Sequence, residues 1–181
     1  MSRLVVYDDR NPGQPEFTTH NAHAIADRLK SINVRFERWA DVEAPPRDAS
    51  QEEILACYRP YLDKLMGETN AGSADVISIS VDTPNRQALR DKFLSEHTHS
   101  EDEVRFFVHG RGNFVLHVGD KVYDVGCTQG DLISVPTGVQ HWFDAGENPD
   151  VVALRIFTHK EGWIAEYTND DIALRFPALI D

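Results

Sequence analysis

Several features that define other classes of protein are scarce in this sequence. Its 181 residues include only two cysteines, Cys57 and Cys127, which stand far apart. Isolated cysteines in a chain of this length do not form a disulfide framework, so we expect reduced thiols and a cytoplasmic location. Apolar runs are short: Leu4–Tyr7 is followed at once by two aspartates, whereas a membrane span needs about 18 apolar residues and a signal peptide an apolar core. These absences predict a soluble protein.

Positive charge is also scarce. The 18 lysines and arginines are outnumbered by 30 aspartates and glutamates, for a net charge of −12. Such a field repels phosphate backbones and anionic lipid surfaces, so we expect neither nucleic acid nor a membrane as a partner. An anionic small molecule stays compatible with this charge, because one buried arginine or a metal ion reverses the potential locally.

The length fits one domain, residues 1–181, in which the texture changes near residue 80. Residues 1–80 read as a mixed α/β arm packed on the remainder. We expect strands and helices there in the order Leu4–Tyr7 (strand), Asn21–Ile32 (helix), Val34–Trp39 (strand), Ser50 to about Gly67 (helix) and Val76–Val81 (strand). Ser50 and Glu53 have the spacing of a capping box and mark the start of the second helix.

In residues 81–181 we expect a third helix from Pro84 to about Phe93. Short β-rich runs follow it. The runs are VRFFVH, NFVLHV, KVYDV, DLISVP, HWFDA and VVALRIF, and glycines divide them. Short strands separated by glycine-containing turns at close spacing are typical of a β-sandwich or β-barrel. The sequence therefore predicts a mainly β protein with an N-terminal arm of two to three helices.

Four residues have the types and spacing of a metal site. His97 and His99 are two apart, so on an extended segment both imidazoles point to the same face. Glu103 follows before an apolar run, and His141 opens a later run after a turn containing glycine and proline. Three imidazoles and one carboxylate suit Fe, Ni, Mn, Co, Cu or Zn. A structural zinc site is disfavoured because it would favour cysteine ligands.

These four residues lie in two segments that resemble a known pair of motifs. The segment H-x-H-x3-E-x6-G that begins at His97 resembles the first motif of the cupins, and G-x5-P-x-G-x2-H, which ends at His141, resembles the second. Asp91 and Ala145 stand where these motifs usually have glycine and asparagine, and neither is a candidate ligand. The resemblance implies a double-stranded β-barrel (jelly roll) with the metal inside.

Within the cupins the chain resembles the acireductone dioxygenase family over nearly its whole length, most strongly from about Phe93 to Trp163. The resemblance implies that O2 cleaves the small enediol 1,2-dihydroxy-3-keto-5-methylthiopentene in methionine salvage. It implies one Fe(II) or Ni(II) per chain, with Co or Mn as substitutes. Iron is implied to give 4-methylthio-2-oxobutanoate and formate, and nickel to give 3-methylthiopropionate, formate and carbon monoxide.

Further residues are candidates for binding the substrate. Arg105 lies two residues beyond Glu103, on the same strand face, and a guanidinium stays charged in a dry site, so we expect it to stabilise the substrate anion. Arg155 is a second candidate; either arginine is alternatively an ion-pair partner on the barrel rim. Four aromatic residues wall a pocket for the methylthio tail or simply pack in the core: Phe93, Phe107, Phe143 and Trp163. The other histidines lack motif partners and are expected to be structural or exposed: His20, His23, His109, His117 and His159.

Two other functions remain open at this point. A different metal-dependent cupin enzyme, such as a diketone- or flavonol-type dioxygenase or a sugar isomerase, would keep the same ligands. A non-catalytic cupin that only binds a small molecule has little need for all four. Nothing in the ligand types decides between iron and nickel, and the resemblance to bacterial members implies a monomer.

Overall fold

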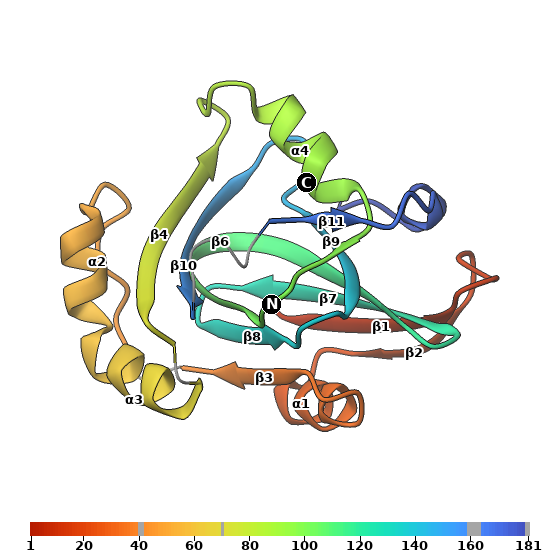
Figure 1. Ribbon diagram of the computed structural model, residues 1–181, viewed down its shortest axis with the longest axis horizontal. Helices are drawn as coiled ribbons and strands as arrows, with labels where there is room; N and C mark the ends of the chain where they lie inside the picture. The colour runs from red at the N-terminus through yellow and green to blue at the C-terminus, as the bar shows by residue number, and fades with distance from the viewer. Residues whose placement is uncertain (40–41, 70, 159–163, 180–181) are drawn as a thin grey trace.

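The computed structural model describes residues 1–39, 42–69, 71–158 and 164–179. Its strands are β1 (Arg3–Asp8), β2 (Pro15–Thr19), β3 (Arg35–Arg38), β4 (Ser73–Ser80), β5 (His97–Thr98), β6 (Glu103–Val118), β7 (Lys121–Thr128), β8 (Asp131–Val135), β9 (Gln140–Asp144), β10 (Asp150–Phe157) and β11 (Glu166–Tyr167). Its helices are α1 (Ala22–Lys30), α2 (Gln51–Cys57), α3 (Arg59–Thr69), α4 (Arg86–Leu94) and the 3-10 helix η2 (Ile172–Arg175). The expected mainly β fold with a helical N-terminal arm is confirmed (Figure 1).

Two antiparallel sheets share the long strand β6. Sheet A has the order β11-β5-β9-β6-β7-β1-β2, and sheet B has the order β3-β8-β6-β10-β4. The first half of β6 pairs with β8 and β10, and the second half pairs with β7 and β9. One strand therefore turns the corner between the two layers, as in a jelly roll.

The corner lies at Gly110, where the sequence alone predicts a break between two strands. That expectation is wrong, because β6 runs through it. Gly110 has φ +74°, and a Cβ at this position would lie 1.6 Å from the carbonyl oxygen of Asp150. The pairing with β10 shifts register between Val152 and Ala153. A glycine close to a bulge lets the strand bend without losing its pairing, so both halves of β6 turn one face to the interior.

The interior between the sheets holds the largest apolar cluster. It includes aromatic and aliphatic side chains from both sheets and from α1, among them Leu4, Leu29, Phe36, Phe107, Phe114, Leu116, Ile133, Phe143 and Ala153. Along the first half of β6 the outward residues, such as Val104 and Phe106, belong to a separate cluster on the back of sheet B. The inward positions of that half are left to Phe107 and to two charged residues, Glu103 and Arg105.

The first 80 residues supply strands as well as helices. β1 pairs with β7, β3 with β8, and β4 with β10. The capping box of Ser50 and Glu53 is confirmed at the start of α2. The single helix expected from Ser50 to about Gly67 is instead two helices, separated at Tyr58. Pro60 explains the break, because it has no N–H to continue the hydrogen bonds of α2 but fits the first turn of α3.

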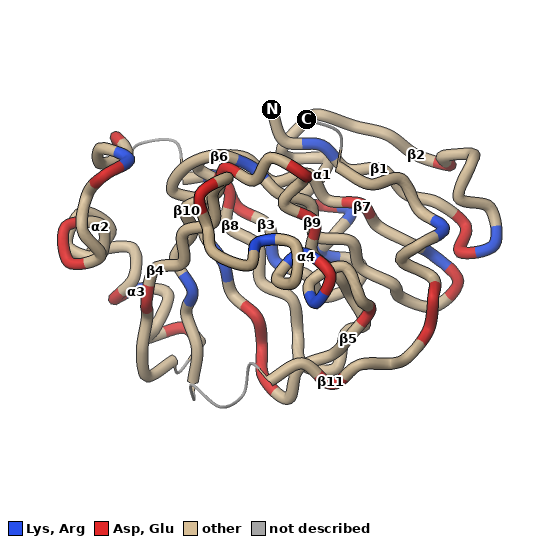
Figure 2. The backbone as a smooth tube through the Cα atoms, turned by 90° about the horizontal axis from the view of Figure 1, so that it is seen from above, with Lys and Arg blue, Asp and Glu red and all other residues tan. Residues whose placement is uncertain are grey.

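Helices and the C-terminal segment cover the outer faces of the two sheets. α2 and α3 lie alongside β4 (Figure 1) and pack on sheet B through Ile54, Leu62 and Leu65. Ile172 and Phe176 cover apolar side chains on the outer face of sheet A. Among the described residues no helix is long and apolar enough to cross a membrane. Acidic and basic residues are interspersed along the described backbone (Figure 2).

Candidate metal centre

Four side chains that the sequence singled out converge at one end of the space between the sheets. His97 is the first residue of β5, His99 follows that strand, Glu103 begins β6, and His141 is the second residue of β9. His97 and His141 are register partners across β5 and β9. One ligand atom from each of the four residues lies within 4.8 Å of the others, and all four side chains are buried.

The backbone fixes the orientation of each imidazole. Nδ1 lies 2.7 Å from the carbonyl oxygen of Ser95 in His97, 3.2 Å from that of Ile164 in His99, and 2.8 Å from that of Val139 in His141. A carbonyl oxygen only accepts, so each Nδ1 donates its proton there. In a neutral ring the lone pair is then on Nε2. This second contact is typical of metal-binding histidines.

Glu103 lies at the centre of the group. Its Oε2 atom is 2.8 Å from His141 Nε2 and 3.2 Å from His99 Nε2. Its Oε1 atom accepts a hydrogen bond of 2.7 Å from Arg105 Nε. Burial raises the pKa of Glu103, but Arg105, His141 and His99 outweigh burial and hold the pKa well below its usual value. Glu103 is therefore a carboxylate although it is buried.

The histidines respond to the same environment in opposite ways. Burial, together with the nearby His141, lowers the pKa of His97 to about 4. Burial also lowers the pKa of His99, but its hydrogen bond and charge interaction with Glu103 outweigh burial, and the pKa lies above its usual value. At neutral pH the ring of His97 is thus neutral and able to donate its Nε2 lone pair to a metal.

These residues fit a divalent transition metal. Donors about 2.1 Å from a common ion lie within about 4.2 Å of one another, close to the spread found here. Two Nε2 atoms and a carboxylate oxygen meet at hydrogen-bond distance, an arrangement that requires positive charge between them, from protons or from a metal ion. Imidazole nitrogens with one carboxylate oxygen are suitable ligands for iron, nickel and their neighbours in the series.

Arg105 lies directly behind the ligand group. It is buried, and besides its bond to Glu103 its guanidinium carbon lies 5.4 Å from the ring centre of Phe143 and 5.7 Å from that of Phe114. Charge placed over an aromatic face in a dry environment gains cation–π stabilisation. The sequence-based expectation that Arg105 shares the strand face of Glu103 is met in this geometry.

Arg155 has a different setting. It is the register partner of Arg105 across β10 and β6, and its guanidinium makes a bidentate ion pair with Asp75 of β4, with both distances 2.7 Å. Its side chain is partly exposed. The structure therefore places Arg155 in a row with Arg105 but directs its Nε and Nη2 atoms to Asp75, a partner that sequence reasoning did not identify.

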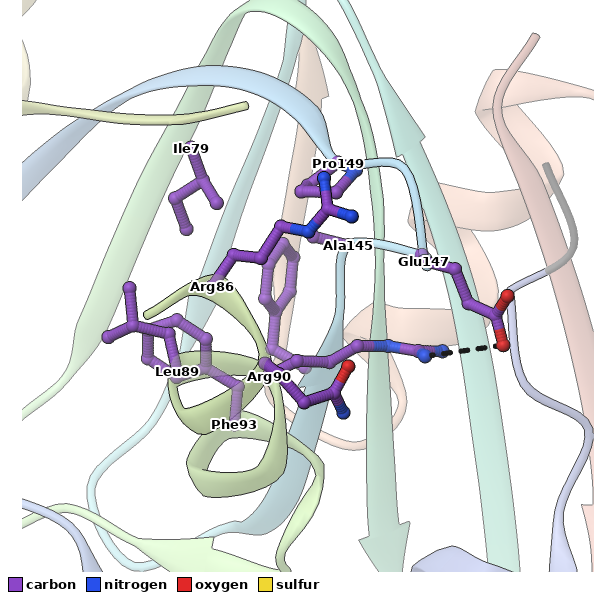
Figure 3. A pocket seen from close by; sticks show the side chains of 11 residues that line it. Ile79, Arg86, Leu89, Arg90, Phe93, Ala145, Glu147 and Pro149 are labelled. Carbon is purple, nitrogen blue, oxygen red and sulfur yellow. Dashed lines mark ion pairs between the residues drawn. The ribbon is translucent and has the colours of Figure 1, made fainter. Parts of the chain in front are cut away.

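The aromatic candidates form a chain of contacts that leads away from Arg105. Phe143 contacts Phe114 with ring centres 5.0 Å apart, Phe107 at 6.5 Å and Phe93 at 6.2 Å. Phe93 projects from α4 into a cavity of about 20 Å³ that is also lined by Phe143 and Ile79 (Figure 3). That volume holds about one water molecule. Trp163, the fourth candidate, lies outside the described residues.

Sequence reasoning missed the segment that lies over the ligand strand. β11 pairs with β5 through Glu166 with Thr98 and Tyr167 with His97, and the two strands run side by side in Figure 2. The ring of Tyr167 is 5.9 Å from that of His97. The carbonyl groups that orient the imidazoles were missed too. Any residue supplies a carbonyl, so the sequence carries no signal for them.

Comparisons with known proteins agree on one family. Residues 3–165 match the model of the ARD/ARD′ family. An acireductone dioxygenase of Gluconacetobacter diazotrophicus is 66% identical over 177 residues, covering 98% of this chain and 99% of the relative. One of Pseudomonas aeruginosa is 50% identical over 181 residues and covers both chains fully.

Among solved structures, an acireductone dioxygenase from Bacillus anthracis superposes with a TM-score of 0.82 at 32% identity. The match covers 92% of this chain and 98% of that chain, and that protein has a cadmium ion in its active centre. The fold of the present chain is therefore that of an enzyme with a metal-binding centre, and the cupin fold implied by the two sequence motifs is supported.

Proposed function

The chain belongs to the ARD/ARD′ family, and on that premise we propose that it is an acireductone dioxygenase whose single metal ion is held by His97, His99, Glu103 and His141. The observation that carries the proposal is the convergence of four buried ligand atoms, with every Nδ1 turned to a carbonyl. The substrate is the enediol 1,2-dihydroxy-3-keto-5-methylthiopentene, and O2 is the second reactant.

The metal is Fe(II) or Ni(II), with Co or Mn as substitutes. When bound, it supplies Lewis-acid character and a template on which enediolate and O2 are brought together. The iron form yields 4-methylthio-2-oxobutanoate and formate, and the nickel form yields 3-methylthiopropionate, formate and carbon monoxide. On a six-coordinate metal these four residues would leave two positions, which would suit a substrate with two adjacent oxygens.

Arg105 stabilises the negative charge of the enediolate. Its Nε donates a 2.7 Å hydrogen bond to Oε1 of Glu103, so the buried guanidinium lies beside the ligand carboxylate. A buried, permanently charged group favours the ionised enediol over the neutral one. Glu103 in turn keeps the arginine in place, because an unpaired guanidinium in this site would be costly.

The remaining candidates shape the site. Phe143 separates Arg105 from Phe93 and, with Phe107, excludes water from one side of the ligand group. We assign these aromatic residues and Trp163 to the wall against which the methylthio tail packs. Arg155, held by Asp75, is assigned to the rim of the same inner face. The chain acts as one domain, residues 1–181, as a cytoplasmic monomer.

Metal analysis and turnover on one preparation, purified without added metal, test the proposal. The enediol is generated in place under anaerobic conditions, and its ultraviolet absorbance is followed after oxygen is admitted. Oxygen-dependent decay with about one iron or nickel per chain is expected, and the products identify the branch. A metal-loaded protein that leaves the enediol unchanged would discard the substrate and favour another cupin enzyme. A protein that folds but takes up no metal would favour a binding module.

A further inference from the structure

Glu96 is a buried carboxylate that the reaction does not use directly. It precedes the ligand His97 in the chain and is 2% exposed. Its Oε1 atom lies 2.8 Å from Nδ1 of His117, and its Oε2 atom accepts a 2.6 Å hydrogen bond from the hydroxyl of Thr168. Its carbonyl oxygen accepts a 3.1 Å bond from the backbone N–H of Thr168. One residue thus holds Thr168 by both its side chain and its main chain.

Thr168 directly follows β11, the strand that lies over the ligand strand β5. β11 pairs with Thr98 and His97 through Glu166 and Tyr167. Two residues before β11, the carbonyl of Ile164 accepts the Nδ1 proton of His99. The two-residue pairing of β5 with β11 is too short to be stable by itself. A contact that fastens its end therefore stabilises the carbonyl that orients His99.

The other partner anchors Glu96 to the body of sheet A. His117 lies in β6, where it is the register partner of Gln140, the residue before the ligand His141. Its Nε2 atom is 3.6 Å from a carboxylate oxygen of Asp9 in the N-terminal segment. The hydrogen-bonded series His117, Glu96, Thr168 connects β6, the residue before β5 and the residue after β11. In the sheet order β9 lies between β5 and β6, so the bridge spans a strand that carries another ligand.

We propose that Glu96 is a positioning residue of the metal centre, which acts through Thr168 and β11 on His99 and through the main chain on His97. Stability alone does not require a carboxylate here, because buried ionic contacts are often no more stabilising than apolar ones of the same volume. Outer contacts of metal ligands typically change metal affinity 10- to 100-fold when removed. The inference rests on the proposed function, since it requires the four ligands to hold a metal.

The test measures release of Ni(II) from the loaded protein to an excess of chelator, together with hydrogen exchange of the metal-free protein. Glu96→Ala is expected to speed release about 10- to 100-fold and to remove amide protection from residues 164–168. Glu96→Gln keeps an acceptor for Thr168 and gains a donor for His117, so release is expected within about threefold of the parent. Thr168→Val removes the hydroxyl contacts to Glu96 and to the backbone N–H of Asp170 but keeps the main-chain bond to Glu96, and its release is expected between the two.

Asp131→Asn is the matched control. Asp131 is fully buried and bonded to Ser2, Thr128 and Arg38, away from β5 and β11. This variant is expected to change thermal stability without changing Ni(II) release. Release in Glu96→Ala and Thr168→Val that matches the parent, or is no faster than in Asp131→Asn, overturns the proposal. If Glu96→Ala does not fold, Thr168→Val alone decides. A parent protein that binds no Ni(II) refutes the proposed function instead.

Discussion

Glu103 and Asp124 are both 3% exposed, yet their carboxyl groups behave in opposite ways. Glu103 faces the interior between the sheets, and its pKa is held well below the usual value. Asp124 lies in β7, opposite Val5 and Val115 on the outer face of sheet A, and its pKa is raised to about 6. Burial raises the pKa of both groups, so their partners cause the difference.

The partners differ in charge and in their own exposure. Glu103 has the buried Arg105 and two imidazoles within 3.2 Å. Asp124 has Arg3, whose side chain is 38% exposed, and the neutral amide of Asn113. Water weakens the pairing of an exposed arginine, and the nearby carboxylate of Asp144 adds repulsion. The comparison indicates that the metal centre is built to keep a carboxylate charged, whereas the outer cluster only tolerates one.

Removing the carboxylate of Glu103 should have the largest effect on metal content, turnover and stability, and it tests the contrast with Asp124 directly. Glu103→Ala deletes a proposed ligand and the carboxylate that accepts a hydrogen bond from the buried Arg105. We expect metal content and turnover to be lost together, and the metal-free protein to lose about 3–5 kcal/mol of unfolding free energy. Metal analysis and urea denaturation measure both, with Glu147→Ala as an exposed-carboxylate control. Full metal content with full turnover would exclude Glu103 as a ligand.

Replacing Arg105 by lysine tests whether turnover needs only a positive charge at this position or also the planar shape of the guanidinium. Arg105→Lys keeps the positive charge but loses the planar guanidinium that contacts Glu103 and that we propose also faces the substrate anion. We expect metal content to be retained and turnover to fall about 10²- to 10³-fold. Steady-state kinetics at full metal loading measure this change. Unchanged kinetics would remove Arg105 from the site and leave it only the role of an ion-pair partner.

Neutralising Asp124, the outer carboxylate, should raise the unfolding free energy above pH 6, whereas removing Glu103 should lower it. A pKa raised from 3.8 to about 6 means that the folded protein binds this proton more tightly than the unfolded chain. Below pH about 4 both states are protonated and there is no penalty; between pH 4 and 6 the penalty grows, and above pH 6 it reaches about 3 kcal/mol at most. Asp124→Asn removes this dependence.

The measured quantity is the difference in unfolding free energy between Asp124→Asn and the parent at several pH values. It should move in favour of the variant as pH rises from 4 to 8, even though an amide facing Arg3 carries a constant cost of its own. Chemical denaturation at pH 4.5, 6 and 8 gives the three points. A difference that is the same at all three would show that Asp124 ionises without a penalty.

The ligand group could be predicted from the sequence because it depends on residue type and short spacing. Two histidines at positions i and i+2 of an extended segment must share a face, and Glu103 begins the strand that follows. The continuity of β6 could not be predicted, because Gly110 is read equally well as a turn or a bulge. Only the close approach of Asp150 decides between the two.

Contacts between segments that lie far apart in the sequence could not be predicted either. Asp75 meets Arg155 across 80 positions, and Ile164 meets His99 across 65. Neither contact has a local pattern, and the second uses a backbone carbonyl. Pro60 did carry a signal for the break between α2 and α3, but the apolar stripe that continues from Ile54 to Leu65 obscured it. Local patterns identify ligands and caps, whereas the second layer of contacts depends on the tertiary fold.

The N-terminal cap of α2 lies outside the surroundings of both Glu103 and Asp124. A change at this cap should have the smallest effect on stability and serves as a reference for the other variants. The hydroxyl oxygen of Ser50 accepts a hydrogen bond from the backbone N–H of Glu53 at the start of α2, and the carboxylate of Glu53 accepts one from the backbone N–H of Ser50. Ser50→Ala removes the side-chain half of this exchange and should lower the melting temperature by about 2–4 °C. Metal content and turnover should not change, because α2 packs on the back of sheet B, away from the ligands. If this variant released metal, the two faces of sheet B would be coupled, and the effects of Glu103→Ala would no longer belong to the centre alone.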